Sequence, residues 1–334
     1  MRKKATQAAC LGIAVVLFSL WAMMLTGCSV RQNQLASTNP EGEKEGQVKI
    51  MTTLFPQYDF ARQIAGDKAH ITLLLPLGMD SHSYEPTPSD LIAIEEADLF
   101  IYTGDYMEGW ASGILESINQ DHVTVLDVSH GISLDMEEED GHGHEHHAGD
   151  GHNHQFDPHI WTSPVNAQKM VDNILEALCE IDPENADYYR KNAQDYQKKL
   201  SDLDQKIRGI VADGERKEVF FGGTFPFHYF FEEYGLEYEA AYDNCSGETE
   251  PSVGTMTHMI QEMREEKIPV IYYEELVDPK IARTIAEETG AEMLLFHSCH
   301  NVSKDDFERG VTYLDLMNQN AEHLKEGLGV SAET

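Results

Sequence analysis

The longest regular pattern in the chain is residues 182–213, DPENADYYRKNAQDYQKKLSDLDQKIRGIVAD. Asp182 followed by Pro183 is a typical helix start, because proline is tolerated at the first helical position. Apolar residues then recur at helical spacing, at Leu200, Leu203, Ile207 and Ile210. A helix of some 25–30 residues would be about 40 Å long, more than one lobe needs. We therefore expect a spine helix within residues 182–215 that joins two lobes.

Short β-rich runs alternate with helical patterns on both sides of this spine helix. Before it, strands are expected at Val48–Thr53, Ile71–Leu75, Leu99–Thr103 and Val123–Leu126. After it, strands are expected at Glu218–Phe221, Leu236–Ala241, Val270–Tyr273 and Ala291–Phe296, followed by a final helix over Lys304–Lys325. Alternation of this kind predicts parallel sheets. The expected fold is α/β, with an N-terminal lobe over residues 48–181 and a C-terminal lobe over residues 216–334.

Length and charge restrict the function classes. At roughly 100–200 residues per domain, 334 residues correspond to about two domains. There are 24 Lys and Arg residues against 59 Asp and Glu residues, a formal charge of −35. This charge disfavours binding to nucleic acids or to anionic lipid head groups, so no nucleic-acid partner is expected. Cations remain suitable partners.

Residues 1–27 have the pattern of an export signal. Three basic residues precede an apolar run over Ala8–Leu25, and the segment ends in Leu25-Thr26-Gly27-Cys28. A permanent N-terminal membrane anchor is the alternative. The last four residues resemble a bacterial lipobox, which implies that Cys28 is lipidated after cleavage and anchors an exported protein to the membrane. The polar residues 28–47 then predict a flexible stalk.

Cysteine usage leaves the disulfide state open. Apart from Cys10 in the signal and Cys28, the chain has Cys179, Cys245 and Cys299. Cys179 lies in an apolar helical pattern and is expected to be a buried small residue. The other two lie in polar loops and can pair if the fold brings them together.

Residues 136–155 break all periodicity. An acidic run at Glu137–Asp140 precedes six histidines, which are His142, His144, His146, His147, His152 and His154. Neutral imidazoles suit zinc, copper or nickel, so the tract is interpreted as a metal-binding loop, with a merely solvated loop as the alternative. Because its ordering costs conformational entropy, we expect an accessory role rather than the principal site.

Two isolated histidines lie in turn-rich segments between predicted elements. His82 stands in PLGMDSHSYEPTPSD (residues 76–90), between a strand and a capped helix. His159 stands in Asp157-Pro158-His159-Ile160-Trp161, just before the helix that Ser163-Pro164 begins. Ligands of open α/β sheets bind outside the carboxyl ends of the strands. Together with the histidine tract, these positions favour a metal site.

These segments, with Tyr273-Glu274-Glu275 and the long central helix, resemble the solute-binding lipoproteins of zinc and manganese ABC importers over nearly the whole mature chain. The resemblance implies two α/β lobes bridged by a rigid helix, with one divalent ion in the cleft between them. It implies that His82 and His159 are ligands from the first lobe. It also implies a membrane permease as the partner, and we expect a monomer.

The second lobe departs from the family pattern. Thr224 stands where the family usually has a ligand, and His228, one helical turn later, either replaces that ligand or only caps and packs. His297 stands where the family usually has an aspartate and is the third expected ligand. Glu248 and Glu250 either supply an anionic ligand or belong to a solvated turn.

Ligand type favours zinc as the captured ion, with manganese as the alternative, because imidazole suits zinc and manganese prefers oxygen ligands. A zinc hydrolase would need a general base beside bound water, usually in a His-Glu-x-x-His spacing that the chain lacks. We therefore expect a binding protein that delivers zinc to a permease, not an enzyme. A surface metal buffer or adhesin is the remaining alternative, which leaves His82, His159 and His297 unexplained.

Overall fold

The computed structural model describes residues 46–118, 122–135, 156–242 and 251–330, all within one compact unit, Glu41–Thr334. The expected signal, stalk, lipidation site and histidine tract lie outside these residues, as do Cys245, Glu248 and Glu250. None of the helices in the described ranges has the length and apolar character that crossing a membrane requires.

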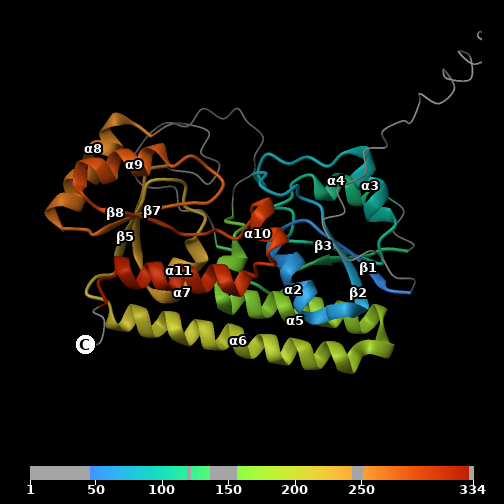
Figure 1. The fold of residues 1–334 in the computed structure, drawn as a ribbon. Coiled ribbons are helices and arrows are strands. Elements are labelled where there is room, and N and C mark those ends of the chain that lie inside the picture. Colours follow the sequence, from blue (N-terminus) through green and yellow to red (C-terminus); the bar gives the residue numbers. More distant parts are fainter. Residues whose placement is uncertain (1–45, 119–121, 136–155, 243–250, 331–334) are drawn as a thin grey trace, which may run out of the picture. The chain divides into compact units, whose positions relative to one another are not determined.

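The first sheet is parallel and has the strand order β2-β1-β3-β4. Its strands are β1 (Val48–Thr52), β2 (Ala69–Leu73), β3 (Leu99–Tyr102) and β4 (Thr124–Asp127). Helix α2 (Phe55–Ala65), followed by the short turn η1 (Gly66–Lys68), covers one face, and α3 (Pro88–Glu95) and α4 (Ala111–Leu115) cover the other (Figure 1). Since both faces are buried, β3 is buried at all four positions.

The second sheet repeats this topology, with the order β6-β5-β7-β8 and parallel pairing throughout. Its strands are β5 (Glu218–Phe221), β6 (Glu237–Ala240), β7 (Val270–Tyr273) and β8 (Glu292–Leu295). Phe220 faces the helices α8 (Val253–Glu265) and α9 (Lys280–Thr289), while Phe221 faces α7 (His228–Tyr234) on the other side (Figure 1). The two sheets confirm the expected fold class.

Two long helices connect the sheets. Helix α5 (Pro164–Ile181) starts at Ser163, whose hydroxyl accepts hydrogen bonds from the backbone of the first turn. A short turn, η3 (Pro183–Asn185), leads into α6 (Ala186–Asp213), which has 28 residues and is about 42 Å long. Helix α6 packs on α2 and α5 at one end and on α7 and α11 (Tyr313–Gly327) at the other, and Figure 1 shows it running past both sheets.

The expected final helix is in fact two helices. Helix α10 (Lys304–Glu308) ends at Gly310, whose φ of 73° is a left-handed conformation that favours glycine. Helix α11 then starts with a capping box, in which Thr312 and Asp315 satisfy each other's backbone N–H groups. The prediction of a continuous helix was wrong because Gly310 stops the first helix and Thr312 caps the second.

Asp59 on α2 joins three helices that come from distant parts of the chain. Its buried carboxylate accepts hydrogen bonds from Arg62, from the Tyr313 backbone N–H of α11 at 2.9 Å and from the Tyr196 hydroxyl of α6 at 3.4 Å. Because the carboxylate has several donors, its burial is compensated. Helices α2, α6 and α11 are thereby held together.

Buried Glu108 completes a polar network under the first sheet. Its Oε2 accepts hydrogen bonds from the backbone N–H groups of Thr103 at 3.0 Å and Gly104 at 3.2 Å. The Thr53 hydroxyl lies between Glu108 Oε1 and Gln57 Oε1, although it has only one proton to donate. A proton on Glu108 therefore satisfies both neighbours. Burial raises the pKa of Glu108 to about 7, although these hydrogen bonds oppose the shift.

We expect Glu108→Gln to remove a pH-dependent loss of stability. A carboxyl whose pKa is raised by folding stabilises the native state while protonated, and this contribution is lost as the pH rises through about 7. The free energy of unfolding of wild type should therefore decrease, relative to that of the variant, by on the order of 2–3 kcal/mol between about pH 5 and pH 8. Chemical denaturation across that range measures the difference, with Glu116→Gln on the exposed side of α4 as the control. Parallel pH profiles for wild type and E108Q would contradict the assignment.

Candidate metal centre

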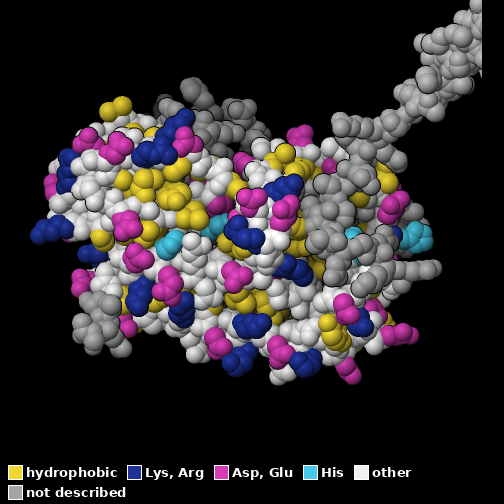
Figure 2. All heavy atoms as spheres, viewed as in Figure 1, with side chains coloured by type: hydrophobic (Ala, Val, Ile, Leu, Met, Phe, Trp, Pro, Cys, Tyr) yellow, Lys and Arg dark blue, Asp and Glu magenta, His cyan; other side chains and the backbone are white. Residues whose placement is uncertain are grey.

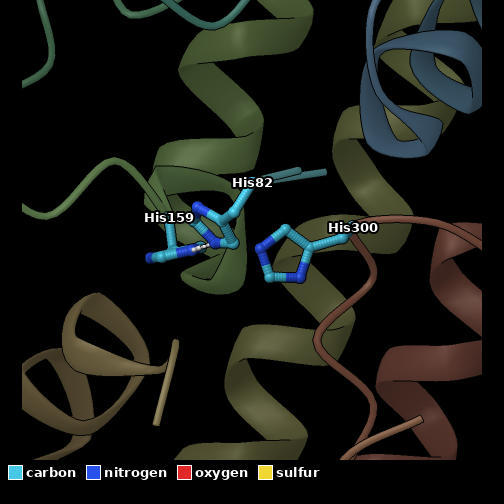
Figure 3. Close-up of side chains that lie close together, drawn as sticks. All are labelled: His82, His159 and His300. Atoms are coloured by element: carbon cyan, nitrogen blue, oxygen red, sulfur yellow. Dashed lines mark hydrogen bonds between the residues drawn. The ribbon is translucent and has the colours of Figure 1, made fainter. Parts of the chain in front are cut away.

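Three histidines from three separate loops converge at one point. His82 lies in the loop between β2 and α3, His159 directly precedes the short turn η2 (Ile160–Thr162), and His300 lies in the loop between β8 and α10. One ring nitrogen from each lies within 4.8 Å of the others. The Nε2 atoms of His82 and His159 are 3.2 Å apart, and the ring centroids of His159 and His300 are 4.8 Å apart (Figure 3).

His159 is held by Asp157. The Asp157 carboxylate accepts hydrogen bonds from the His159 backbone N–H at 2.7 Å and from Nδ1 of its ring at 2.8 Å. With the proton on Nδ1, His159 turns the lone pair of Nε2 toward His82. Burial favours protonation of Asp157, but the His159 contacts outweigh it and lower the pKa of the carboxyl. The ring itself is fully buried.

His82 is placed by a tight turn. The carboxylate of Asp80 accepts a hydrogen bond from the His82 backbone N–H at 3.0 Å, and the Ser83 hydroxyl donates to the Asp80 carbonyl at 3.1 Å. The loop then enters α3 at Thr87, which forms a capping box with Asp90. This turn presents the His82 ring to His159 and leaves it half-buried.

His300 is held by a chain of side chains from the second sheet. The Ser298 hydroxyl donates to Glu275 and lies 2.5 Å from Nδ1 of His300. Because the hydroxyl proton goes to Glu275, the Nδ1 proton of His300 donates to Ser298, and Nε2 has the lone pair. This Nε2 is buried and has no hydrogen-bond partner in the described part of the chain. Burial, and then the rings of His159 and His82, hold the pKa of His300 well below its usual range.

The loop that presents His300 is bound to the first lobe by hydrogen bonds to backbone carbonyl groups. The Trp161 indole donates to the Ser298 carbonyl at 2.8 Å, and the Phe55 N–H donates to the His300 carbonyl at 3.1 Å. The Asn301 amide donates to the carbonyls of Pro76 at 2.7 Å and Met79 at 2.9 Å. The loop that follows the second sheet is thus held against the first lobe.

The three rings fit a zinc ion. The hydrogen bonds at Nδ1 of His159 and of His300 leave a lone pair on Nε2 of each ring. Without a bound cation, the buried Nε2 of His300 has no partner, which is costly. Three imidazoles leave one position of a four-coordinate zinc site for a further ligand. A nitrogen-rich set suits zinc better than manganese.

The other expected ligands lie elsewhere among the described residues. His297 is buried, its Nδ1 accepts a hydrogen bond from the Cys299 backbone N–H at 3.0 Å, and its own backbone is bonded to Asn320. His228, at the start of α7, lies 3.8 Å from a carboxylate oxygen of Asp135 and 3.9 Å from one of Glu232. Neither belongs to the cluster of His82, His159 and His300.

Thr224, at the usual ligand position of the family, donates a hydrogen bond to Glu274. Burial, and then the nearby carboxylates of Glu275 and Asp80, raise the pKa of Glu274 to about 7, although the bonds from Thr224 oppose this. Glu274 and Glu275 are therefore polar groups enclosed at the carboxyl end of β7, beside the loop that carries His300.

His300 is not among the ligands that the sequence predicts, although it lies in the same segment as His297, which is. His297 and His300 are three residues apart, and both follow β8. The turn between them depends on Cys299, whose φ of 64° is unusual for a residue other than glycine. A positive φ at a cysteine is not indicated by local sequence, so the histidine that points to the cluster could not be selected.

Cys299 also corrects an expectation. The residue was placed in a polar loop and considered as a partner of Cys245, but its thiol is free and fully buried. Burial raises the pKa of the thiol far above its usual value. Cys179 is likewise free and packs against the core from α5, but it is only partly buried, whereas a buried residue was expected.

Comparison with known proteins gives a consistent result. Residues 50–327 match the family model described as zinc-uptake complex component A, periplasmic (ZnuA). The high-affinity zinc uptake system protein ZnuA of Bacillus subtilis is 37% identical over 89% of this chain and 93% of its own length. The zinc-binding lipoprotein AdcA of Streptococcus pneumoniae is 30% identical over 94% of this chain, which spans only 60% of that longer protein.

Among solved structures, the metal-dependent lipoprotein YcdH of Bacillus subtilis has a TM-score of 0.73 and 36% identity, over 84% of this chain and 99% of the other. The similarity extends across both sheets and the helices between them, because the matched region runs from β1 to α11. The resemblance found in the sequence is thereby confirmed, and the chain belongs to the ZnuA family of periplasmic zinc-uptake components.

Proposed function

We propose that this protein binds zinc outside the cytoplasm and delivers it to an ABC permease. The observation that carries the proposal is the buried, unpartnered Nε2 of His300, which faces His82 and His159. In this proposal the three rings are the zinc ligands, and His300 takes the place given to His297 by the sequence. The names of the relatives, a zinc uptake protein and a zinc-binding lipoprotein, support zinc as the ion.

The residues around the ligands prepare them for the ion. Zinc binds neutral imidazole, and the lowered pKa of His300 keeps its ring neutral at physiological pH. Asp157 and the Ser298–Glu275 pair fix which nitrogen of His159 and of His300 has the lone pair. Less reorganisation is then needed when the ion enters, which favours tight binding.

The hydrogen bonds that the nearby carboxylates accept favour a carrier over a zinc hydrolase. A hydrolase needs a general base that is free to take a proton from metal-bound water. Asp157 is bonded to the ring and backbone of His159, and Glu275 is bonded to the hydroxyl and backbone of Ser298. Both carboxylates orient ligands, so we propose capture and release without catalysis.

The proposal extends to regions outside the described residues. Lipidation of Cys28 would anchor the exported protein to the membrane as a monomer, beside its permease. The tract with His142, His144, His146, His147, His152 and His154 would collect zinc and increase its local concentration. The similarity to proteins named as lipoproteins supports the first of these steps.

Replacing His300 by Asn removes Nε2 but keeps a polar group near the position of Nδ1. We expect H300N to weaken zinc binding by more than about 100-fold, because loss of an outer-shell partner alone costs roughly 10- to 100-fold. His82→Ala and His159→Ala should have the same effect. Calorimetric zinc titration of metal-free protein measures the affinities.

His297→Asn is the matched control, since it keeps an acceptor for the Cys299 N–H and removes a ring of the same size. Its zinc affinity should stay close to that of wild type. Tight binding retained in H300N and lost in H297N would overturn the assignment of His300 and support His297.

Ser298→Ala tests the positioning of His300. Without the hydroxyl, the Nδ1 proton of His300 loses its acceptor and its link to Glu275, so we expect zinc affinity to fall roughly 10- to 100-fold. Ser303→Ala in the same loop removes the cap of α10 and should cost only roughly 1 kcal/mol of stability. Equal zinc affinities in the two variants would show that Ser298 does not orient the ligand.

Deletion of residues 140–155 tests the accessory role of the histidine tract. We expect one tight zinc-binding step to remain and the number of weaker steps to fall, because the three-histidine cluster lies outside the deleted segment. Equilibrium dialysis against zinc counts the sites. Loss of the tight step would favour the surface-buffer alternative.

A further inference from the structure

A second group of possible metal ligands lies between the edge of the second sheet and α8. Glu218 of β5 stands opposite Glu237 of β6, and Phe220 stands opposite Glu239. Because side chains alternate along a strand, the three glutamates share the face on which Phe220 meets α8 and α9. Carboxylates are therefore placed beside an apolar layer.

Helix α8 adds more acidic groups above this edge. His258 and Glu262 are four residues apart, so they lie on one side of the helix, and Glu266 at its C-terminal end follows at the same spacing. Burial, and then the Glu262 carboxylate, raise the pKa of Glu239 to about 7. Burial also raises the pKa of Glu218, with Glu262 and Glu237 adding to the shift. The carboxylates repel one another without full compensation.

The imidazole of His258 lies between two of these carboxylates and reduces their repulsion. His258 Nε2 lies 3.7 Å from Glu239 Oε1 and 3.4 Å from Glu262 Oε2. Arg264, in the last turn of α8, pairs instead with Glu288. Within the described ranges, Glu262 Oε2 is shielded from solvent without a hydrogen-bond partner, although the Glu262 side chain as a whole is 29% exposed. A carboxylate oxygen shielded from water in this way is stabilised by a cation close to it.

We infer that Glu239, His258 and Glu262 form a second divalent-cation site, separate from the three-histidine cluster. One ligand atom from each residue lies within 4.8 Å of the others, and the His258 side chain is 68% exposed, so an ion can enter from solvent. Two carboxylate oxygens and one imidazole nitrogen are a ligand set that zinc accepts, with water completing the coordination. The ion would replace the repulsion between β6 and α8 by attraction.

The test follows the His258 ring itself, so that binding elsewhere does not interfere. Imidazole resonances of the full protein are recorded by NMR at neutral pH while zinc is added beyond the first tight equivalent, and the His258 signal is identified by its loss in His258→Ala. We expect this signal to shift in wild type and to remain unchanged in the Glu239→Gln, Glu262→Gln double variant. The exposed His130 is the matched control and should not shift in either protein.

Thermal unfolding provides an independent readout. The double variant should be more stable than wild type without zinc, because the repulsion between the carboxylates is gone, and its stability should rise less when zinc is added.

A His258 signal that does not shift when zinc is added would overturn the site and indicate that the carboxylates only share a proton. If zinc stabilises wild type and H258A against thermal unfolding to the same extent, and no more than calcium does, the imidazole is not a ligand. Loss of the first tight zinc step in H300N tests the proposed function separately, and neither result depends on the other.

Discussion

The structure depends on the hydrogen bonds that bind the loop after β8 to the first lobe. Trp161, Phe55, Pro76 and Met79 contact a segment that is more than 130 residues away in the sequence. These bonds, whose acceptors are backbone carbonyl groups, hold His300 beside His82 and His159. The three-histidine cluster is therefore a consequence of how the two sheets are joined, since neither sheet alone has all three rings.

The framework under this junction is continuous. Buried apolar side chains form one cluster from Ile50 of the first sheet through Leu200 of α6 to Phe221 of the second. The Asp59 carboxylate adds polar bonds between α2, α6 and α11. On the face that Figure 2 shows, acidic groups are spread widely, which agrees with the strong negative charge of the chain. The three-histidine cluster, in contrast, consists of imidazole nitrogens.

Much of the fold follows from local sequence. The strands Glu218–Phe221 and Val270–Tyr273 match the expected ranges, because short apolar runs between turn signals leave little choice. His82 and His159 could be selected because each lies beside proline-rich turns next to a predicted element. His300 could not, because its position depends on the backbone turn at Cys299 and on bonds to Trp161. The pairing of Ser298 with Glu275 is likewise a tertiary contact without a local signal.

The attachment of the His300 loop also affects how fast an ion can be exchanged. The ring of His159 is fixed by Asp157 and that of His300 by Ser298, and separating the two halves would break the bonds of Asn301 and Trp161 together. The turn that carries His82 is held by Asp80 and belongs to the first lobe alone. Exchange of a metal held by the three rings, as proposed above, therefore requires either movement of this turn or breakage of the bonds of Asn301 and Trp161 together. A partner that displaces the turn can accelerate release without separating the two sheets.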